Sequence, residues 1–183
     1  MKIKNYEKFH SQLDLPFLET NKEYLKEIFQ TLEFKFGLQS NSKQKFIDLG
    51  AGNGTVVIFI ALNHNIKSYG IEIDQKLIIE AKDRIESLKR EGNYNKSLLK
   101  KIKIHLGDFY LFSLKDYDFI YIYSLPSMHK YLKHVFNTAK NGAVIISHKY
   151  PLLDFDFILN NEYKLFHKNS NQKICTFFYK KTL

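Results

Sequence analysis

Residues 46–54 read Phe-Ile-Asp-Leu-Gly-Ala-Gly-Asn-Gly, an apolar run that ends in an acid and a glycine-rich turn. This pattern is typical of a buried parallel strand whose turn lets a ligand approach the backbone closely. A dinucleotide-binding turn would need its third glycine at position 55, which is a threonine, and a phosphate-binding loop would need a lysine that this turn lacks. The carboxylate of Asp48 can instead face a positively charged amine. The turn therefore favours a cofactor that carries an amino acid over one held by its pyrophosphate.

Strand-like and helix-like stretches alternate from this turn onward. The apolar spacing predicts buried strands at 46–49, 68–73, 102–106, 117–123 and 143–147, with helices at 56–63, between Asp74 and Gly92, and at 128–139. Strands separated by helices of this length are joined by right-handed crossovers into a parallel sheet that is covered on both faces.

Both ends of the chain extend this alternating core. Near the N-terminus, Thr20–Glu23 has the form of a capping box, followed by a helical apolar stripe that Gly37 ends. Near the C-terminus, the strand-like runs 163–167 and 174–179 predict an antiparallel hairpin. The expected fold is α/β: a Rossmann-like, doubly wound, mostly parallel seven-stranded sheet with an N-terminal helix and a C-terminal hairpin. We expect one domain, built from a helical lead-in (1–38), a cofactor-binding core (45–150) and the hairpin (151–183).

Composition narrows the class of protein. The 183 residues suffice for one domain, and 44% hydrophobic with 26% charged residues excludes a disordered chain. The longest apolar run, 56–62, is far shorter than the ~20 residues that span a bilayer, and the N-terminus has no signal-like apolar region. We therefore expect a cytoplasmic protein. A single cysteine, Cys175, and scattered histidines predict no metal site.

The formal charge of +9 is compatible with a polyanionic partner, but its make-up is informative. Only Arg84 and Arg90 are arginines, and the lysines are spread along the chain. Arginine has the planar geometry that suits phosphates and guanine edges, whereas lysine is a hydrated point charge. A lysine-rich solubilising surface and a nucleic-acid-binding face both remain open.

Acids follow the next two expected strands as well. Glu72 closes the second strand, 24 residues after Asp48, where an acid can accept hydrogen bonds from ribose hydroxyls. Asp108 follows the third strand, where its carboxylate can accept from the amine of adenine while Phe109 packs on the base. The carboxyl ends of parallel strands meet at one edge of the sheet, so these features predict one cofactor site.

The stretches 46–61, 69–74 and 107–109 resemble the class I S-adenosylmethionine-dependent methyltransferases, over about residues 40–150. This resemblance implies S-adenosyl-L-methionine as the cofactor. By the same likeness the methionine moiety would be held by the side chain of Asp48 and the backbone of the glycine turn, at Gly50, Ala51 and Gly52. Glu72 would bind the ribose, and Asp108 with Phe109 would bind the adenine.

A narrower resemblance lies outside these motifs. Residues 15–21 contain a Pro-x-x-x-Thr lead-in that is similar to a group of archaeal and mitochondrial protein lysine methyltransferases, as are 123–128 and 142–150. The resemblance implies a protein substrate and places Thr20 at the cofactor. Ala51 and Asn53 depart from the residues that many relatives carry, and the polar C-terminal hairpin is longer.

A lysine acceptor must lose a proton before it can attack a methyl group. Its reference pKa is about 10.4, and an apolar aromatic environment disfavours the ammonium form. Tyr123 is our candidate for orienting the amine, with Ser124 beside it and His148 as a candidate base; alternatively, these are ordinary residues at strand ends. The loop at 124–127 lacks the N/D-P-P-Y/F pattern of enzymes that methylate adenine N6 or glutamine amides.

Two other functions stay open. An RNA methyltransferase is compatible with the positive charge, although the two arginines and the missing loop motif weaken it. A non-catalytic S-adenosylmethionine-binding regulatory module is the other, although neither the glycine turn nor the ribose acid is broken.

Overall fold

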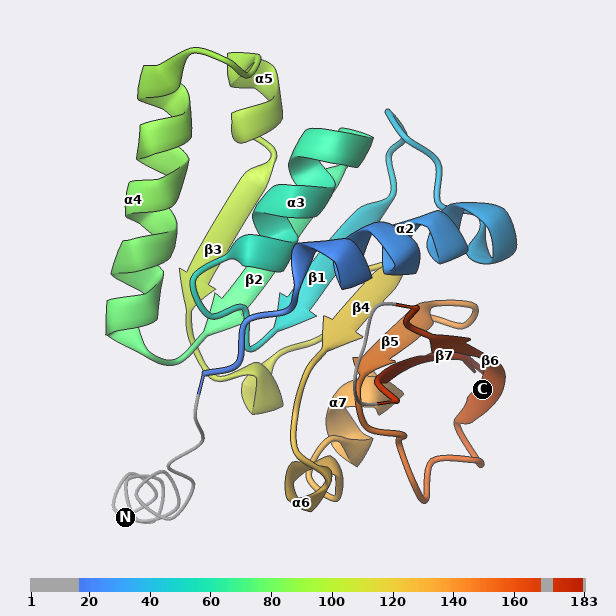
Figure 1. The fold of residues 1–183 in the computed structure, drawn as a ribbon. Coiled ribbons are helices and arrows are strands. Elements are labelled where there is room, and N and C mark those ends of the chain that lie inside the picture. The colour runs from blue at the N-terminus through green and yellow to red at the C-terminus, as the bar shows by residue number, and fades with distance from the viewer. Residues whose placement is uncertain (1–16, 169–172, 183) are drawn as a thin grey trace, which may run out of the picture.

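A computed structural model describes residues 17–168 and 173–182 and contains one seven-stranded mixed sheet (Figure 1). The strands are β1 (Lys45–Leu49), β2 (Lys67–Glu72), β3 (Ile102–Leu106), β4 (Phe119–Ile122), β5 (Val144–His148), β6 (Leu159–Phe166) and β7 (Cys175–Lys181). Their order across the sheet is β3-β2-β1-β4-β5-β7-β6. The predicted fold class is confirmed, with strand bounds that differ from the predicted ones by a few residues.

The first five strands are parallel, and the hairpin is antiparallel to them. β7 pairs with β5, and β6 pairs with β7 and forms the edge of the sheet. The predicted hairpin is therefore confirmed, although part of its connection, 169–172, lies outside the described residues, as do residues 1–16 of the predicted lead-in. Because β1, β2 and β3 are parallel, Leu49, Glu72 and Leu106 end their strands at the same edge.

Helices cover the sheet on both faces. They are α2 (Lys22–Phe36), α3 (Thr55–His64), α4 (Gln75–Glu91), α5 (Lys96–Leu99), α6 (Pro126–His129) and α7 (Lys133–Asn137), with a 3-10 turn η1 (Phe109–Leu111). α4 is capped by Asp74 and ends at Gly92, as predicted. Within the described residues, no helix has the length and apolar composition needed to cross a bilayer.

The predicted capping box at the start of α2 is wrong by one residue. Asn21 is the N-cap, and its side chain accepts a hydrogen bond from the Glu23 amide at 2.8 Å. The Thr20 hydroxyl lies instead 2.8 Å from the hydroxyl of Tyr121 on β4. Asparagine and threonine both cap helices well, so the local sequence could not decide between them. The tertiary contact of Thr20 decided it.

The predicted helix at 128–139 is two short helices, α6 and α7. The apolar stripe nevertheless identified the buried face, since Leu132, Val135 and Phe136 are fully buried. The break falls at 130–132, Lys-Tyr-Leu, which contains neither glycine nor proline. The sequence therefore had no local signal for it.

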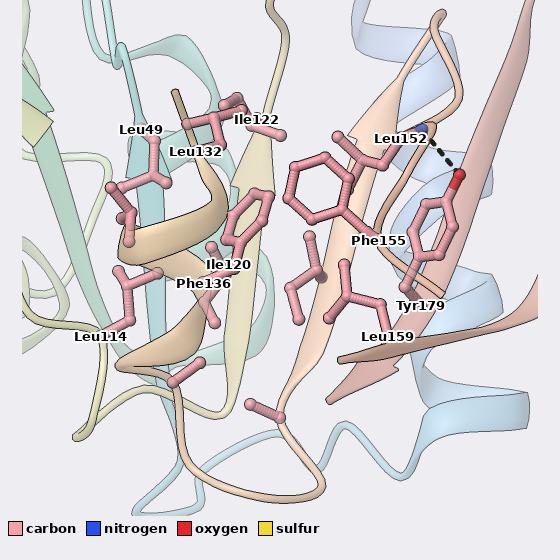
Figure 2. Close-up of a cluster of buried hydrophobic side chains, with 14 of the residues drawn as sticks. Leu49, Leu114, Ile120, Ile122, Leu132, Phe136, Leu152, Phe155, Leu159 and Tyr179 are labelled. Carbon is pink, nitrogen blue, oxygen red and sulfur yellow. Dashed lines mark hydrogen bonds between the residues drawn. The ribbon is translucent and has the colours of Figure 1, made fainter. Parts of the chain in front are cut away.

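Alternate residues of the central strands face two separate hydrophobic layers, as the pleat of a strand requires. Ile120 and Ile122 of β4 face a layer completed by α7 and the segment before β6, where Leu132, Phe136 and Phe155 pack together (Figure 2). The Leu152 amide there donates to the Tyr179 hydroxyl at 2.9 Å. Phe119 and Tyr121 face the opposite layer, under α2 and α3. Tyr123, one of the predicted site residues, packs against this second layer, whereas Phe109 packs against the first.

Candidate cofactor and acceptor site

The glycine turn after β1 is anchored to β2. The amides of Gly50 and Ala51 both donate to the Ile71 carbonyl, at 2.9 Å each. Gly50 and Gly52 have φ of 83° and 54°, in the left-handed region that side chains with a Cβ rarely adopt. The turn therefore needs glycine at both positions.

Glu72 ties the turn to the end of β2. Its Oε2 accepts from the Gly52 amide at 2.8 Å, and its Oε1 accepts from the amides of Ile73 and Asp74 at 2.8 and 2.9 Å. The residue is 8% exposed. A carboxylate has about four acceptor positions, so one remains for a ribose hydroxyl after these three bonds.

Asp48 is the most deeply buried acid of the site, at 3% exposure. Burial raises its pKa well above the usual range, and the Glu72 carboxylate raises it further. No group among the described residues donates a hydrogen bond to it. A bound ammonium group would supply the missing countercharge, which is the role predicted for the cofactor's amine.

Asp108 has one satisfied and one unsatisfied carboxylate oxygen. Oδ1 accepts from the Tyr110 amide at 2.8 Å, whereas Oδ2 is buried with no partner within the part of the chain that the structure describes. Burial raises the pKa of this carboxyl. The adjacent Phe109 ring lies 3.9 Å from where a Cβ on Gly50 would stand, so it borders the glycine turn. An unsatisfied acceptor beside an aromatic ring fits the exocyclic amine of adenine.

The segment before α2, at Phe17 and Glu19, lies over the glycine turn, a relationship that the sequence did not predict. The Phe17 ring is so close to Gly52 that a Cβ there would stand 2.0 Å from it. Glu19 accepts hydrogen bonds from the Thr55 hydroxyl and the Asn53 amide.

Arg84 of α4 completes this arrangement. Its guanidinium donates to Thr55 Oγ1 at 2.7 Å and to the Asn53 carbonyl at 3.2 Å, and lies 3.5 Å from Glu19. The scarcity of arginine in the chain was the one sequence signal that could have singled out Arg84.

Thr20 is buried against β4. It is 5% exposed and bonds Tyr121, which pairs with Asp48 in the register of β1 and β4. The structure thus connects Thr20 through Tyr121 to the strand pair that carries Asp48, while Pro16 and Leu15 of the quoted lead-in lie outside the described residues.

The three proposed catalytic residues lie at the ends of β4 and β5. The rings of Tyr123 and His148 are 4.9 Å apart and perpendicular. Ser124 is 8% exposed, and its hydroxyl is buried with no partner among the described residues. Burial, with His167 and Lys149 nearby, lowers the pKa of His148 to about 3. This end of the site is aromatic and holds an unused hydroxyl.

These features together fit S-adenosylmethionine. Among the described residues, Asp48 has no countercharge, Glu72 retains acceptor capacity and Asp108 has one oxygen without a partner, in chain order along three adjacent strands. Each deficit matches one part of the cofactor: the amine, the ribose and the adenine. No group of three or more potential metal ligands occurs within 17–168 and 173–182.

The fold is that of the class I methyltransferases, which solved structures illustrate. An RNA methyltransferase from Salinibacter ruber with S-adenosyl-L-homocysteine superposes with a TM-score of 0.70 at 20% identity, over 90% of this chain and 94% of that one. Magnesium protoporphyrin IX methyltransferase from Synechocystis gives 0.64 at 12% identity, over 98% and 94%. TrmK from M. capricolum gives 0.62 at 17% identity, over 89% and 70%. Identities this low show a shared fold.

The sequence also matches the family described as "ANTKMT methyltransferase domain" over residues 48–157, more than half of the chain. The chain belongs to this family. It is a class I methyltransferase whose cofactor is S-adenosyl-L-methionine. The comparison with curated proteins finds no match.

Proposed function

We propose that this methyltransferase modifies lysine side chains of protein substrates. The observation that carries the proposal is the environment at the end of β4: the Tyr123 ring packs on His148, and the next residue, Ser124, has a buried hydroxyl with no partner among the described residues. The motifs that resemble protein lysine methyltransferases lie at this same end, at 123–128 and 142–150. Both the aromatic environment and the motif resemblance concern the site of the methyl acceptor rather than the cofactor.

An aromatic, poorly solvated wall has a specific effect on a lysine acceptor. Removing a proton from an exposed lysine at pH 7 costs about 4.6 kcal/mol, and burial of the ammonium in apolar surroundings lowers that cost. The Ser124 hydroxyl can accept a hydrogen bond from the neutral amine and so fix its direction. Alignment of the nucleophile is worth as much as ~7–11 kcal/mol.

When bound, S-adenosylmethionine supplies a methyl group that leaves a sulfonium as the new C–N bond forms, with the C–S electron pair staying on sulfur. The chain's own residues would hold the cofactor's charged and polar ends at Asp48, Glu72 and Asp108. They would also exclude water from the acceptor through Tyr123 and the lead-in segment.

The end of β4 does not suit a planar amine. The segment Ser124-Leu125-Pro126 offers no amide or carboxylate that could hold an exocyclic amine in plane, and Leu125 is the N-cap of α6 without a side-chain hydrogen bond. A lysine amine needs no such planar recognition. This favours lysine over base amines as the acceptor.

The test is incubation of the purified protein with tritiated S-adenosylmethionine and a cell extract, split between protease and RNase treatment. Label that protease removes, and that acid hydrolysis releases as N-methyllysine, supports the proposal. Label that RNase removes identifies an RNA methyltransferase and overturns it. Cofactor binding with no label identifies a non-catalytic binding module and also overturns it. The variant Glu72→Ala, which loses the expected ribose contact, controls for a contaminating enzyme.

A further inference from the structure

A chain of hydrogen-bonded side chains crosses the layer between α2 and the sheet. His148 on β5 lies opposite Thr176 on β7 in the antiparallel register, with His148 Nδ1 2.8 Å from Thr176 Oγ1. The same hydroxyl lies 2.8 Å from His167 Nε2, and His167 Nδ1 lies 2.6 Å from Glu27 Oε2 on α2. Two strands, the residue that follows a third and a helix thus contribute to one continuous path; β5, β7 and β6 lie side by side in Figure 1.

Only one placement of the protons along this path is chemically consistent. An ionised carboxylate only accepts hydrogen bonds, so Glu27 requires a proton on His167 Nδ1. Burial lowers the pKa of His167, and the ring is therefore neutral near pH 7 and accepts at Nε2. Thr176 has a single hydroxyl proton, which it gives to His167. It must then accept from His148 Nδ1, and His148 keeps a lone pair on Nε2.

The middle of this path is shielded from water. Thr176 is 0% exposed, His148 3% and the His167 side chain 0%, whereas the Glu27 side chain is 26% exposed. Only the Glu27 end therefore reaches water to a substantial degree. The Tyr24 ring covers the middle, 4.4 Å from the His167 ring and 5.9 Å from the His148 ring. In so dry a layer each broken hydrogen bond is costly, which keeps the path connected.

The opposite end of the path reaches the proposed acceptor site. His148 packs against Tyr123, the residue that follows β4, and its Nε2 has no hydrogen-bond partner among the described residues. Tyr121, whose ring is 6.3 Å away, has its hydroxyl engaged by Thr20. The one uncommitted nitrogen of the path, as far as the described residues go, thus belongs to the ring that borders the acceptor.

We propose that Glu27, His167 and Thr176 form a proton relay that holds His148 with its Nε2 lone pair available and lets it take a proton from the acceptor lysine. The inference rests on the proposed function. His148 is the catalytic residue in this scheme, because it contacts the reacting group, and the other three act through it.

Each proton in the relay has a donor and an acceptor. An ammonium proton moves from the lysine to His148 Nε2, the Nδ1 proton moves to Thr176 Oγ1, and the hydroxyl proton moves to His167 Nε2. The His167 Nδ1 proton moves to Glu27. The products are a neutral amine and a carboxylic acid, and no ring carries a net charge at any stage. After the methylated product leaves, the reverse shift ionises Glu27 and releases the proton on His148 Nε2 to water.

The surroundings explain why a relay would be needed. The titratable groups that face the two rings are Tyr24 and Glu27 from α2, Tyr121 and Tyr123 from β4 and its end, and Lys149 after β5. Because burial lowers the pKa of His148 to about 3, a lone imidazole here would be a poor place to leave a proton. Passing a proton on through the relay to the partly exposed Glu27 carboxylate removes this obstacle.

Two kinds of measurement test the relay. Long-range ¹⁵N–¹H NMR on the cofactor-free protein reads the histidine tautomers without any substrate, and we expect the Nδ1–H form for His148 and His167. Steady-state methylation of lysine in a protein extract then compares Thr176→Val, which removes the hydroxyl but keeps the shape, with Thr176→Ser, which keeps it. We expect kcat to fall about 100-fold in Thr176→Val and to stay within about threefold in Thr176→Ser.

The variant Glu27→Gln separates positioning from proton acceptance. Its amide oxygen can still accept from His167 Nδ1, so the tautomers should persist while kcat falls, and cofactor affinity should stay within about twofold of the wild type. A wild-type His148 that carries its proton on Nε2 overturns the relay. Equal kcat in Thr176→Val and Thr176→Ser, in a wild type that forms methyllysine, overturns the relay alone. A wild type that labels RNA but no lysine overturns the proposed function and the relay with it.

Discussion

The Glu72 carboxylate and the Gly52 amide are joined by a hydrogen bond of 2.8 Å that links the end of β2 to the glycine turn. The two residues are 20 apart in sequence, yet the acid proposed to bind the ribose also holds the turn proposed to bind the methionine moiety. Cofactor affinity and the shape of the turn are therefore coupled, and variants of the site must be assessed for both.

Glu72→Ala should weaken cofactor binding by about 2 kcal/mol, or roughly 30-fold, because a charged hydrogen-bond acceptor is lost. It should also lower the melting temperature, because three backbone amides lose their acceptor. Isothermal titration calorimetry and thermal unfolding measure the two effects. Glu86→Ala, on the exposed side of α4, should change neither. Unchanged affinity in Glu72→Ala would mean that the ribose lies elsewhere.

Asp108→Asn should weaken cofactor binding about tenfold with little change in stability. The amide oxygen can still accept from the Tyr110 amide, but an NH₂ group then stands where the orphaned Oδ2 awaits a donor. Titration calorimetry with S-adenosylhomocysteine measures the loss. The matched control is Asp116→Asn, whose side chain is exposed. Equal affinities for both variants would remove Asp108 from the adenine site.

Asp48→Asn should stabilise the protein at alkaline pH while weakening cofactor binding. The pKa of Asp48 is raised in the folded state above its unfolded value of about 3.9, so the folded protein keeps a proton that the unfolded chain releases. The stability that this proton contributes is fully present below the unfolded pKa. It is lost as pH rises through the folded pKa, and asparagine has no such proton to lose.

Urea unfolding at pH 5 and pH 8 checks this expectation for Asp48. The wild type should lose more stability between the two pH values than Asp48→Asn does. In calorimetry, binding of the cofactor's ammonium beside Asp48 should release a proton in the wild type and none in the variant. If Asp48→Asn is the less stable protein at pH 8, the carboxyl is ionised and satisfied in the fold.

Gly70→Ala should destabilise the glycine turn from behind. A Cβ on Gly70 would stand 2.6 Å from the Cβ of Ala51, in the turn itself, and 3.0 Å from the side chain of Val57 on α3. Overpacking of this kind costs about 1–3 kcal/mol. Gly107→Ala is the control for stability, since its nearest contact would be an ordinary 3.7 Å. Equal melting temperatures of the two variants would show that the residues around Gly70 shift at little cost to accept the added Cβ.

Acid should destabilise the fold through its buried histidines. Burial lowers the pKa of His148 to about 3, whereas the unfolded value is about 6.5. The unfolded state therefore binds an extra proton in this window, and stability present above pH 6.5 is lost as pH falls toward 3. Urea unfolding at pH 7.5 and 4.5 should show a smaller decline for His148→Gln than for His105→Gln, whose imidazole is exposed. Identical declines in the two variants would contradict a lowered pKa of His148 in the folded protein.

The sequence predicted the features that depend on neighbouring residues. The five parallel strands and the hairpin followed from apolar periodicity, and Asp74 and Gly92 bounded α4 as predicted. The acids Glu72 and Asp108 could be placed at one edge of the sheet because parallel strands end together. Where two neighbouring residues were equally good helix caps, as with Thr20 and Asn21 at the start of α2, the prediction from sequence was wrong. The sequence also did not predict the break between α6 and α7, which contains neither glycine nor proline.

By itself, then, the sequence determined the sheet, its glycine turn and the positions of the acids at the strand ends, because hydrophobic spacing and strand ends are local properties. Only the tertiary structure decided that Arg84 and Glu19 clamp the turn, and that His148 connects through Thr176 and His167 to Glu27. His167 and Glu27 are 140 residues apart. Contacts across such distances depend on which strands are neighbours, on their register and on the docking of α2, and no local pattern encodes any of these.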